Sequence, residues 1–267
     1  MLEETIQLLN HADPAVRFEA AQKLGASNDR RAVAPLIDAL PDDNAKVQYA
    51  ALSGLIKLGD PSAAHALVDL LLSDPDSRVW DLLKLGIGQR LRSGLLDMIT
   101  PGDIPLADRL AAALEEEILD EQQQAFIVRL LGRTRDTRAV DMLINRLAED
   151  TLTMQAAAAE ALGYIGDLRA VTPLLPCLSS PSDAVREVAI EALGRLGDPR
   201  AVDPVIAALS DEHEWVRRAA CVALGQLGEK RAVEPLAEAL GDEFSIVQDA
   251  AFEAIKHLSD TSFHMTH

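Results

Sequence analysis

The sequence predicts an all-α fold, a right-handed α-solenoid of about eight two-helix repeats of 31 residues. Three observations predict it: the residue composition, a motif that recurs at a fixed spacing, and the apolar pattern inside that motif. Hydrophobic residues make up 48% of the 267 residues, but aromatic residues only 3%. A core of Ala, Leu, Val and Ile is typical of closely packed helices, whereas a β-sandwich or barrel uses more aromatic and β-branched residues.

The recurring motif is most evident in residues 185–211 and 216–242, where more than half of the aligned residues are identical. The two copies begin 31 residues apart, and similar steps connect most of the chain. Such self-similarity is typical of a solenoid, because a two-helix unit cannot bury its apolar face alone and needs neighbours on both sides. The residues that mark the eight copies, called anchors here, are Val16, Val47, Val79, Gln123, Met154, Val185, Val216 and Val247.

Each repeat is predicted to contain two helices. In residues 185–196 apolar side chains recur at i, i+3, i+4, i+7 and i+8, the stripe of an amphipathic helix. The pair Gly197-Asp198 then ends the helix, because glycine adopts the left-handed conformation and aspartate accepts hydrogen bonds from the amides that open the next helix. That helix is predicted over residues 200–209, with Pro204 in its opening turn.

One segment breaks the period. Val79 and Gln123 are 44 residues apart, and residues 100–105, TPGDIP, contain two prolines and a glycine. Residues 106–119 then predict one further helix with a strongly acidic end. The sequence therefore predicts repeats over 1–89, an irregular unit with an extra helix over 90–122, and repeats over 123–267, all in one continuous solenoid. The irregular unit is either a hinge between two arms or a repeat that has drifted neutrally.

The motif VRxxAxxALGxLGDxRAVxPL stands nearly complete at 185–205 and 216–236, and in weaker form at 16–36, 47–67 and 154–174. It resembles the short HEAT-like repeat of the phycobilisome-lyase type, over about nine-tenths of the chain. That family includes bilin lyases, a metal hydroxylase and many interaction scaffolds, so the resemblance predicts the fold and leaves the function open.

In this architecture the second helix of each hairpin lines the inner, concave wall, and positions two and six beyond each anchor are expected to face the groove. Phe18 and Tyr49 place aromatic rings in the first arm, and carboxylates gather in the second arm. The predicted wall residues are Phe18, Gln22, Tyr49, Ser53, Trp80, Asp81, Arg129, Glu160, Glu187, Glu191, Arg218, Asp249 and Glu253.

Accessible aromatic side chains are favoured interface anchors, so the wall predicts a non-catalytic protein–protein interaction adaptor or assembly scaffold. Its groove is expected to have an apolar N-terminal half and an acidic C-terminal half, and to bind a peptide or protein with a basic segment. Two simpler interpretations stay open. Phe18 and Tyr49 also suit the apolar edge of neighbouring helices, and an acidic row also suits a solvated face.

The composition and net charge limit the classes of partner and the locations that are expected. The formal net charge of -18 disfavours nucleic acid, since affinity for it depends on neutralising phosphates. No apolar run is long enough for a membrane span, and residues 1–13 lack the pattern of a signal peptide, so a cytoplasmic location is expected. Cys177 and Cys221 lie in apolar helical contexts and are interpreted as inert buried thiols. No cofactor and no metal are predicted.

Two enzymatic alternatives follow from the resemblance. A hydroxylase of the deoxyhypusine hydroxylase type needs His-Glu pairs two and three places after the anchors, and no such pair contains histidine here; the one His-Glu, His213-Glu214, is predicted in a turn. The second alternative is a phycobilin lyase or bilin chaperone that acts on phycobiliproteins. It would hold its bilin chromophore with Phe18, Tyr49, Trp80 and Arg129.

Overall fold

The computed structural model describes residues 2–73, 80–81, 88–116, 118–148 and 151–264, and every regular element in these residues is helical. The all-α prediction is therefore confirmed. The chain divides into two compact units, Met1–Leu119 and Asp120–His267. The predicted anchor Val79 lies outside the described residues. Of the other anchors, Val185, Val216 and Val247 are buried as expected.

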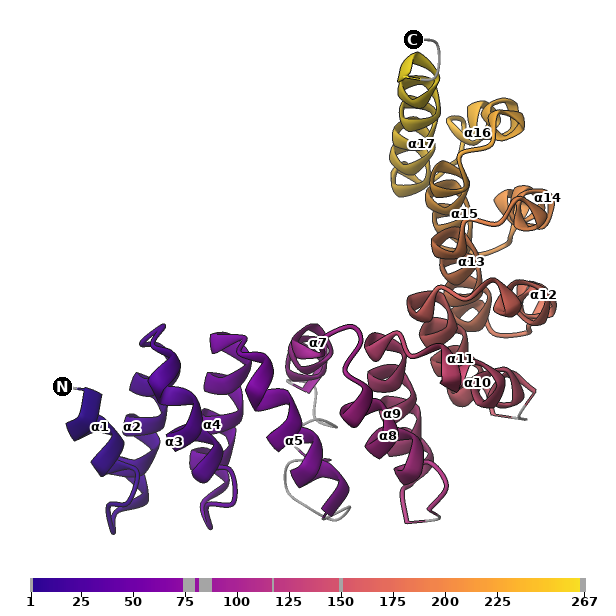
Figure 1. Cartoon of the computed structure of the whole chain (residues 1–267). Helices are drawn as coiled ribbons and strands as arrows, with labels where there is room; N and C mark the ends of the chain where they lie inside the picture. Colours follow the sequence, from indigo (N-terminus) through magenta and orange to yellow (C-terminus); the bar gives the residue numbers. More distant parts are fainter. Residues whose placement is uncertain (1, 74–79, 82–87, 117, 149–150, 265–267) are drawn as a thin grey trace. The chain divides into compact units, whose positions relative to one another are not determined.

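The N-terminal unit contains seven α-helices in its described part, and Figure 1 shows α1, α2, α3 and α4 one after another along the unit. Asp13 and Asn44 begin α2 and α4 by accepting hydrogen bonds from Ala15 and Lys46 amides through their side chains. The helices are α1 (Leu2–Leu8), α2 (Pro14–Gly25), α3 (Val33–Asp38), α4 (Ala45–Leu58), α5 (Pro61–Ser73), α7 (Gly88–Met98) and α8 (Ile104–Ala113).

The C-terminal unit alternates long and short helices, which Figure 1 shows as a row of long helices with the short ones beside them. Each long helix packs on the next one along the row, and their apolar stripes form the core. The long helices are α9 (Glu121–Thr134), α11 (Leu152–Ile165), α13 (Asp183–Leu196), α15 (Glu214–Leu227) and α17 (Ser245–His264). The short helices are α10 (Val140–Leu147), α12 (Val171–Leu174), α14 (Val202–Ala207) and α16 (Val233–Ala239).

The predicted Gly-Asp turn has the expected geometry. Gly197 ends α13 with a φ of 68°, and the Asp198 carboxylate accepts a hydrogen bond of 2.9 Å from the Arg200 amide. Hydrogen bonding to Arg200 lowers the pKa of Asp198 to about 2. The following element differs from the prediction, because it opens as a 3₁₀ turn, Pro199–Ala201, and α14 itself spans only Val202–Ala207.

The irregular segment contains the predicted break and the predicted extra helix. Helix α7 ends at Met98 and α8 begins at Ile104, with Gly102 at a φ of 84° between them. The prediction that this helix extends to residue 119 is wrong, because α8 ends at Ala113. Successive carboxylates after that point face the negative end of the helix dipole, which disfavours a longer helix.

Candidate functional site

Helices α2 and α4 enclose a groove of about 240 Å³ in the N-terminal unit. Phe18 and Gln22 line it from α2, and Tyr49 and Ser53 line it from α4. These four residues are the first four of the predicted wall, and the structure brings them together. Both aromatic residues are half-buried, so part of each apolar ring stays accessible at the groove.

Two glycines form one end of this groove and explain why α2 and α4 approach so closely. A Cβ atom added to Gly25 would lie 2.4 Å from the Gly54 Cα atom. No side chain fits at such a contact, so the two backbones touch. Gly25 and Gly54 are themselves buried and contribute to the wall of the groove beside the two aromatic rings.

Trp80 does not lie on an accessible wall, and this part of the prediction is wrong. Its indole is only 3% exposed, and the indole N–H donates a hydrogen bond of 2.8 Å to the Leu71 carbonyl. Burying the large apolar ring of a tryptophan is worth more than exposing it, once its indole N–H has a hydrogen-bond partner. Its neighbour Asp81 is exposed.

Arginines of the same unit pair with two carboxylates of the predicted acidic row, Glu160 and Glu191. Arg129 donates to the Glu160 carboxylate at 2.9 Å, which joins α9 to α11. Arg195 donates to Glu191 at 3.0 Å along α13. Burial, and next the charge of Glu191, raise the pKa of Glu187, which is half-buried. Two of the five predicted carboxylates are therefore paired with arginines, and the acidic face of this unit stays a prediction.

The last three predicted wall residues lie on α15 and α17. The Arg218 guanidinium carbon lies 5.9 Å from the centre of the Trp215 ring. Asp249 and Glu253 are exposed on α17, and Glu253 lies 3.7 Å from the Lys256 ammonium. Only this end of the unit keeps carboxylates of the predicted row that face solvent.

The residues of the bilin-binding alternative lie in different surroundings within their own units. Phe18 and Tyr49 share the groove, but Trp80 is buried and Arg129 belongs to the C-terminal unit, where it is paired with Glu160.

His213 is the N-cap residue of α15, where its Nδ1 atom accepts a hydrogen bond from the Trp215 amide at 3.4 Å. Within the described part of the chain, no three His, Cys, Asp or Glu side chains gather in a way that suits a metal ion.

The two cysteines lack the properties of a nucleophile. Cys221 is fully buried and Cys177 is half-buried. Burial raises the pKa of both thiols, and that of Cys221 to about 12. A thiolate is scarce at neutral pH under these conditions, so neither cysteine is activated.

The comparison with protein families decides what kind of chain this is. The family model for HEAT repeats matches residues 2–82, 107–186 and 171–256, which together make up most of the sequence. The chain is a HEAT-repeat protein. The model leaves residues 83–106 unmatched, and these overlap the irregular segment predicted from the sequence. No curated protein sequence is significantly similar to this chain.

Several solved structures align with this HEAT-repeat protein, two of them with a TM-score above 0.5. The complex of CpcE and CpcF of phycocyanin lyase from Nostoc sp. PCC7120 aligns with 21% identity and a TM-score of 0.52, over 97% of this chain and 94% of that one. Kap95p bound to RanGDP aligns with 16% identity and a TM-score of 0.65, over 96% of this chain and 41% of that one. Human deoxyhypusine hydroxylase aligns with 20% identity and a TM-score of 0.45, over 97% of this chain and 96% of that one.

No described helix is both long and apolar enough to span a membrane.

The sequence analysis missed a second cavity, of about 590 Å³, at the C-terminal ends of the long helices. The Tyr164 ring lies between two guanidinium groups, with the Arg133 carbon 3.9 Å and the Arg195 carbon 4.6 Å from the ring centre. The period contained the necessary signal, because both arginines and the tyrosine stand ten residues after an anchor. Only positions two and six were considered as surface positions.

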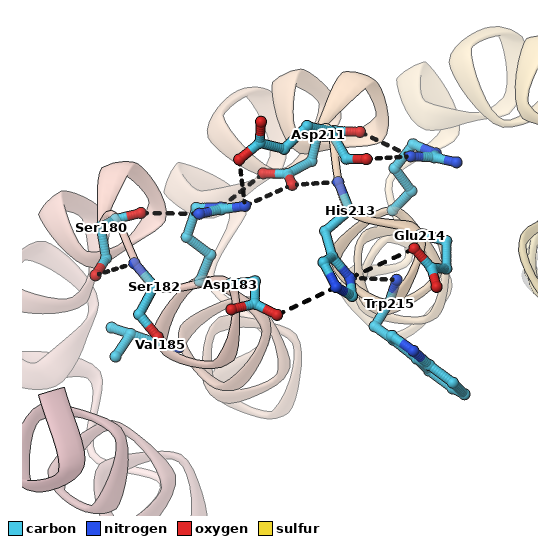
Figure 2. A network of polar contacts seen from close by, with 11 residues as sticks. Ser180, Ser182, Asp183, Val185, Asp211, His213, Glu214 and Trp215 are labelled. Atoms are coloured by element: carbon cyan, nitrogen blue, oxygen red, sulfur yellow. Dashed lines mark hydrogen bonds and ion pairs between the residues drawn. The ribbon is translucent and has the colours of Figure 1, made fainter.

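A buried ion pair that connects successive turns was also missed. Arg186 donates to both Asp211 oxygens at 2.8 Å, and its third nitrogen donates to the Ser180 carbonyl at 3.0 Å. Figure 2 shows Asp211 in this network, together with Ser180, Ser182 and His213 from the turns that precede α13 and α15. The side chain of Trp215 extends away from the network, and Trp215 is 45% exposed.

Proposed function

We propose that this HEAT-repeat protein is a non-catalytic adaptor or assembly scaffold that binds another protein through the groove between α2 and α4. The observation that carries the proposal is the pair of half-buried rings, Phe18 and Tyr49, on either side of one groove. Partly exposed aromatic residues in a preformed groove lose little conformational entropy on binding and are favoured anchors of protein interfaces. A cytoplasmic location is part of the same proposal.

The ligand of the groove is, on this proposal, a short segment that inserts one apolar side chain between the two rings. Gln22 and Ser53 supply hydrogen-bonding groups at the rim, and Lys57 adds a positive charge. A groove of about 240 Å³ is too small for a whole helix and suits a side chain of a partner surface. The sequence predicts a partner with a basic segment. In this proposal such a segment binds at the exposed carboxylates Asp249 and Glu253 on α17.

The irregular segment is proposed to let the two units adjust to a partner. Two findings support it: the chain divides between Leu119 and Asp120, inside the predicted segment 90–122, and the repeat model leaves residues 83–106 unmatched. Fluorescent labels at one exposed position in each unit test this by energy transfer. A broad distribution of transfer efficiencies in the free protein is expected, and a single narrow distribution would contradict a hinge.

The groove is tested with the double variant Phe18→Ala, Tyr49→Ala. We expect partners that copurify with the tagged wild-type protein from its native cells to be lost with this variant, because both apolar contacts are removed. Mass spectrometry of the purified complexes measures the loss. Phe252→Ala on α17 is the matched control, since it removes a ring that is 58% exposed and lies in the other unit.

Circular dichroism of each variant checks that the helices remain folded. If the double variant recovered the same partners in the same amounts as the wild-type protein, the α2–α4 groove would not be the binding site. If Phe252→Ala lost the same partners, the interaction would depend on exposed rings in general rather than on this groove.

A further inference from the structure

The cavity at the C-terminal ends of the long helices has an unusual charge for this protein. It is lined by side chains of α11, α13, α15 and α17 and by the residue that caps α9. The chain as a whole has 43 acidic and 25 basic residues. The described lining nevertheless includes Arg135, Arg195 and His257 and no carboxylate. The nearest acidic contact that the structure shows for these arginines is Glu191, which pairs with Arg195.

Contacts with Tyr164 and Glu191 hold Arg195 in place. Tyr164 lies between the guanidinium groups of Arg133 and Arg195, within cation–π distance of both. Arg195 uses one nitrogen for its 3.0 Å contact with Glu191 and keeps further N–H donors. Arg135 caps α9 in the left-handed conformation, with a φ of 57°, and its side chain is exposed beside the cavity.

We propose that this cavity binds an acidic segment of a partner protein, with Asp or Glu carboxylates held by Arg135 and Arg195 beside the Tyr164 ring. Guanidinium groups bind carboxylates with two parallel hydrogen bonds, and a pre-positioned arginine loses less entropy in doing so. The volume of about 590 Å³ accommodates two or three side chains of an extended peptide. The site is separate from the α2–α4 groove and does not depend on the function proposed for it.

Charge also decides between an acidic peptide and a nucleic acid. A long phosphate backbone would have to lie across the surface of a chain whose formal charge is -18, and its affinity would be reduced accordingly. A short segment with a few carboxylates meets only the local cationic groups. The cavity therefore favours a peptide whose negative charge is confined to a few residues.

The test uses fluorescein-labelled hexaglutamate and fluorescence anisotropy with the full chain, and hexaglutamine and hexalysine peptides as controls. Binding of hexaglutamate alone is expected, and it should weaken as salt rises from about 50 to about 300 mM. The double variant Arg135→Glu, Arg195→Glu is expected to weaken binding about tenfold or more, because it replaces the two carboxylate partners with like charges. Arg135→Glu alone, which leaves the Glu191 pair intact, should weaken it by a smaller factor.

A charge-matched variant separates local from global effects. Lys23→Glu with Arg30→Glu makes the same change in net charge on exposed side chains of the other unit, and it should leave the affinity within about twofold. Equal losses in both double variants would overturn the proposal, as would an absence of hexaglutamate binding at low salt.

Two further outcomes would assign the cavity to another occupant. If light scattering showed a dimer that Arg135→Glu converts to a monomer, the occupant would be a second copy of this chain. If single-stranded DNA displaced hexaglutamate at a lower concentration than unlabelled hexaglutamate does, the site would prefer phosphate.

Discussion

At the scale of single residues, the arginine that follows an anchor has a structural role that recurs along the chain. Arg17, Arg186 and Arg217 each donate two side-chain hydrogen bonds to an aspartate 25 residues later and one or more to carbonyls of the preceding turn. All three pairs are largely buried. At the same position of the second repeat, Gln48 is buried and its Oε1 atom has no hydrogen-bond partner among the described residues.

These pairs yield a prediction for stability. Arg217→Gln should lower the free energy of unfolding by about 3 kcal/mol, because it leaves the Asp242 carboxylate buried without its cation. Urea denaturation at neutral pH measures the loss. The control is Arg231→Gln, whose ion pair with Asp203 is exposed and should cost less than about 1 kcal/mol. Similar losses in the two variants would show that burial does not strengthen the pair.

The same pair makes a pH-dependent contribution. Hydrogen bonding to Arg217 lowers the pKa of Asp242 below its ordinary value of 3.8. A depressed folded-state pKa means that the contribution is complete above the ordinary value and is lost as the pH falls through the folded-state value. The difference between wild type and Arg217→Gln should therefore shrink below about pH 4.

The surroundings of a residue were predictable from the sequence where its position in the repeat determines them. They were much less predictable where a side chain of a neighbouring helix determines them. The burial of Val185 and the turn geometry of Gly197 follow from their place in the repeat. The pairing of Arg129 with Glu160 depends on the distance between two neighbouring helices, which a single repeat does not specify. Trp80 was misplaced because it stands one residue after its anchor rather than two, and the residues at that position, such as Arg186 and Arg217, are also buried.

At the scale of helices, a row of glycines allows the long helices to touch. Gly132, Gly163, Gly194 and Gly225 each stand nine residues after an anchor and meet an alanine seven residues after the next anchor. The contact loosens along the row, since an added Cβ would lie 2.4 Å from the neighbouring Cα atom at Gly132 and 3.2 Å from it at Gly225. This explains the first glycine of the ALGxLG motif, whereas the sequence analysis explained only the second.

The gradient predicts different results for the same substitution. Gly163→Ala should destabilise the protein by about 1 kcal/mol or more, because its Cβ would lie 2.7 Å from the Ala192 Cα atom and the helices must separate. Gly225→Ala should destabilise the protein less than Gly163→Ala, since Ala254 needs to move by only a few tenths of an ångström and alanine favours the helix by about 1 kcal/mol. Thermal unfolding measures both, and the reverse order of stability would contradict the row.

At the scale of the whole molecule, the repeats form two units whose contacts are mostly internal. The sequence predicted a change near residue 90 and a new start at 123, close to the division between Leu119 and Asp120. The apolar pattern alone could not assign the helices of the irregular segment to either side, because they suit the core of both. The division follows from which helices pack together.

The division predicts that residues 120–267 fold when expressed alone. Stability in a repeat array is the sum of the repeats and the interfaces between neighbours, and this fragment keeps every interface from α9 to α17. We expect a helical circular-dichroism spectrum and a cooperative thermal transition. A fragment of residues 140–267 lacks α9 and exposes the face of α11 that α9 covers, so it should melt at a lower temperature. An unfolded 120–267 fragment would show that the units depend on each other.

The arginine–aspartate pairs have a consequence for how the chain acquires its structure. Each pair closes a loop of 25 residues, so its two ends emerge from the ribosome within a few seconds of each other during synthesis. Contacts of such low sequence separation lose little chain entropy on closing and favour fast folding. Each hairpin can therefore form its ion pair with the preceding turn while the downstream sequence is still untranslated. The folded hairpins then expose an apolar face on which the next hairpin packs.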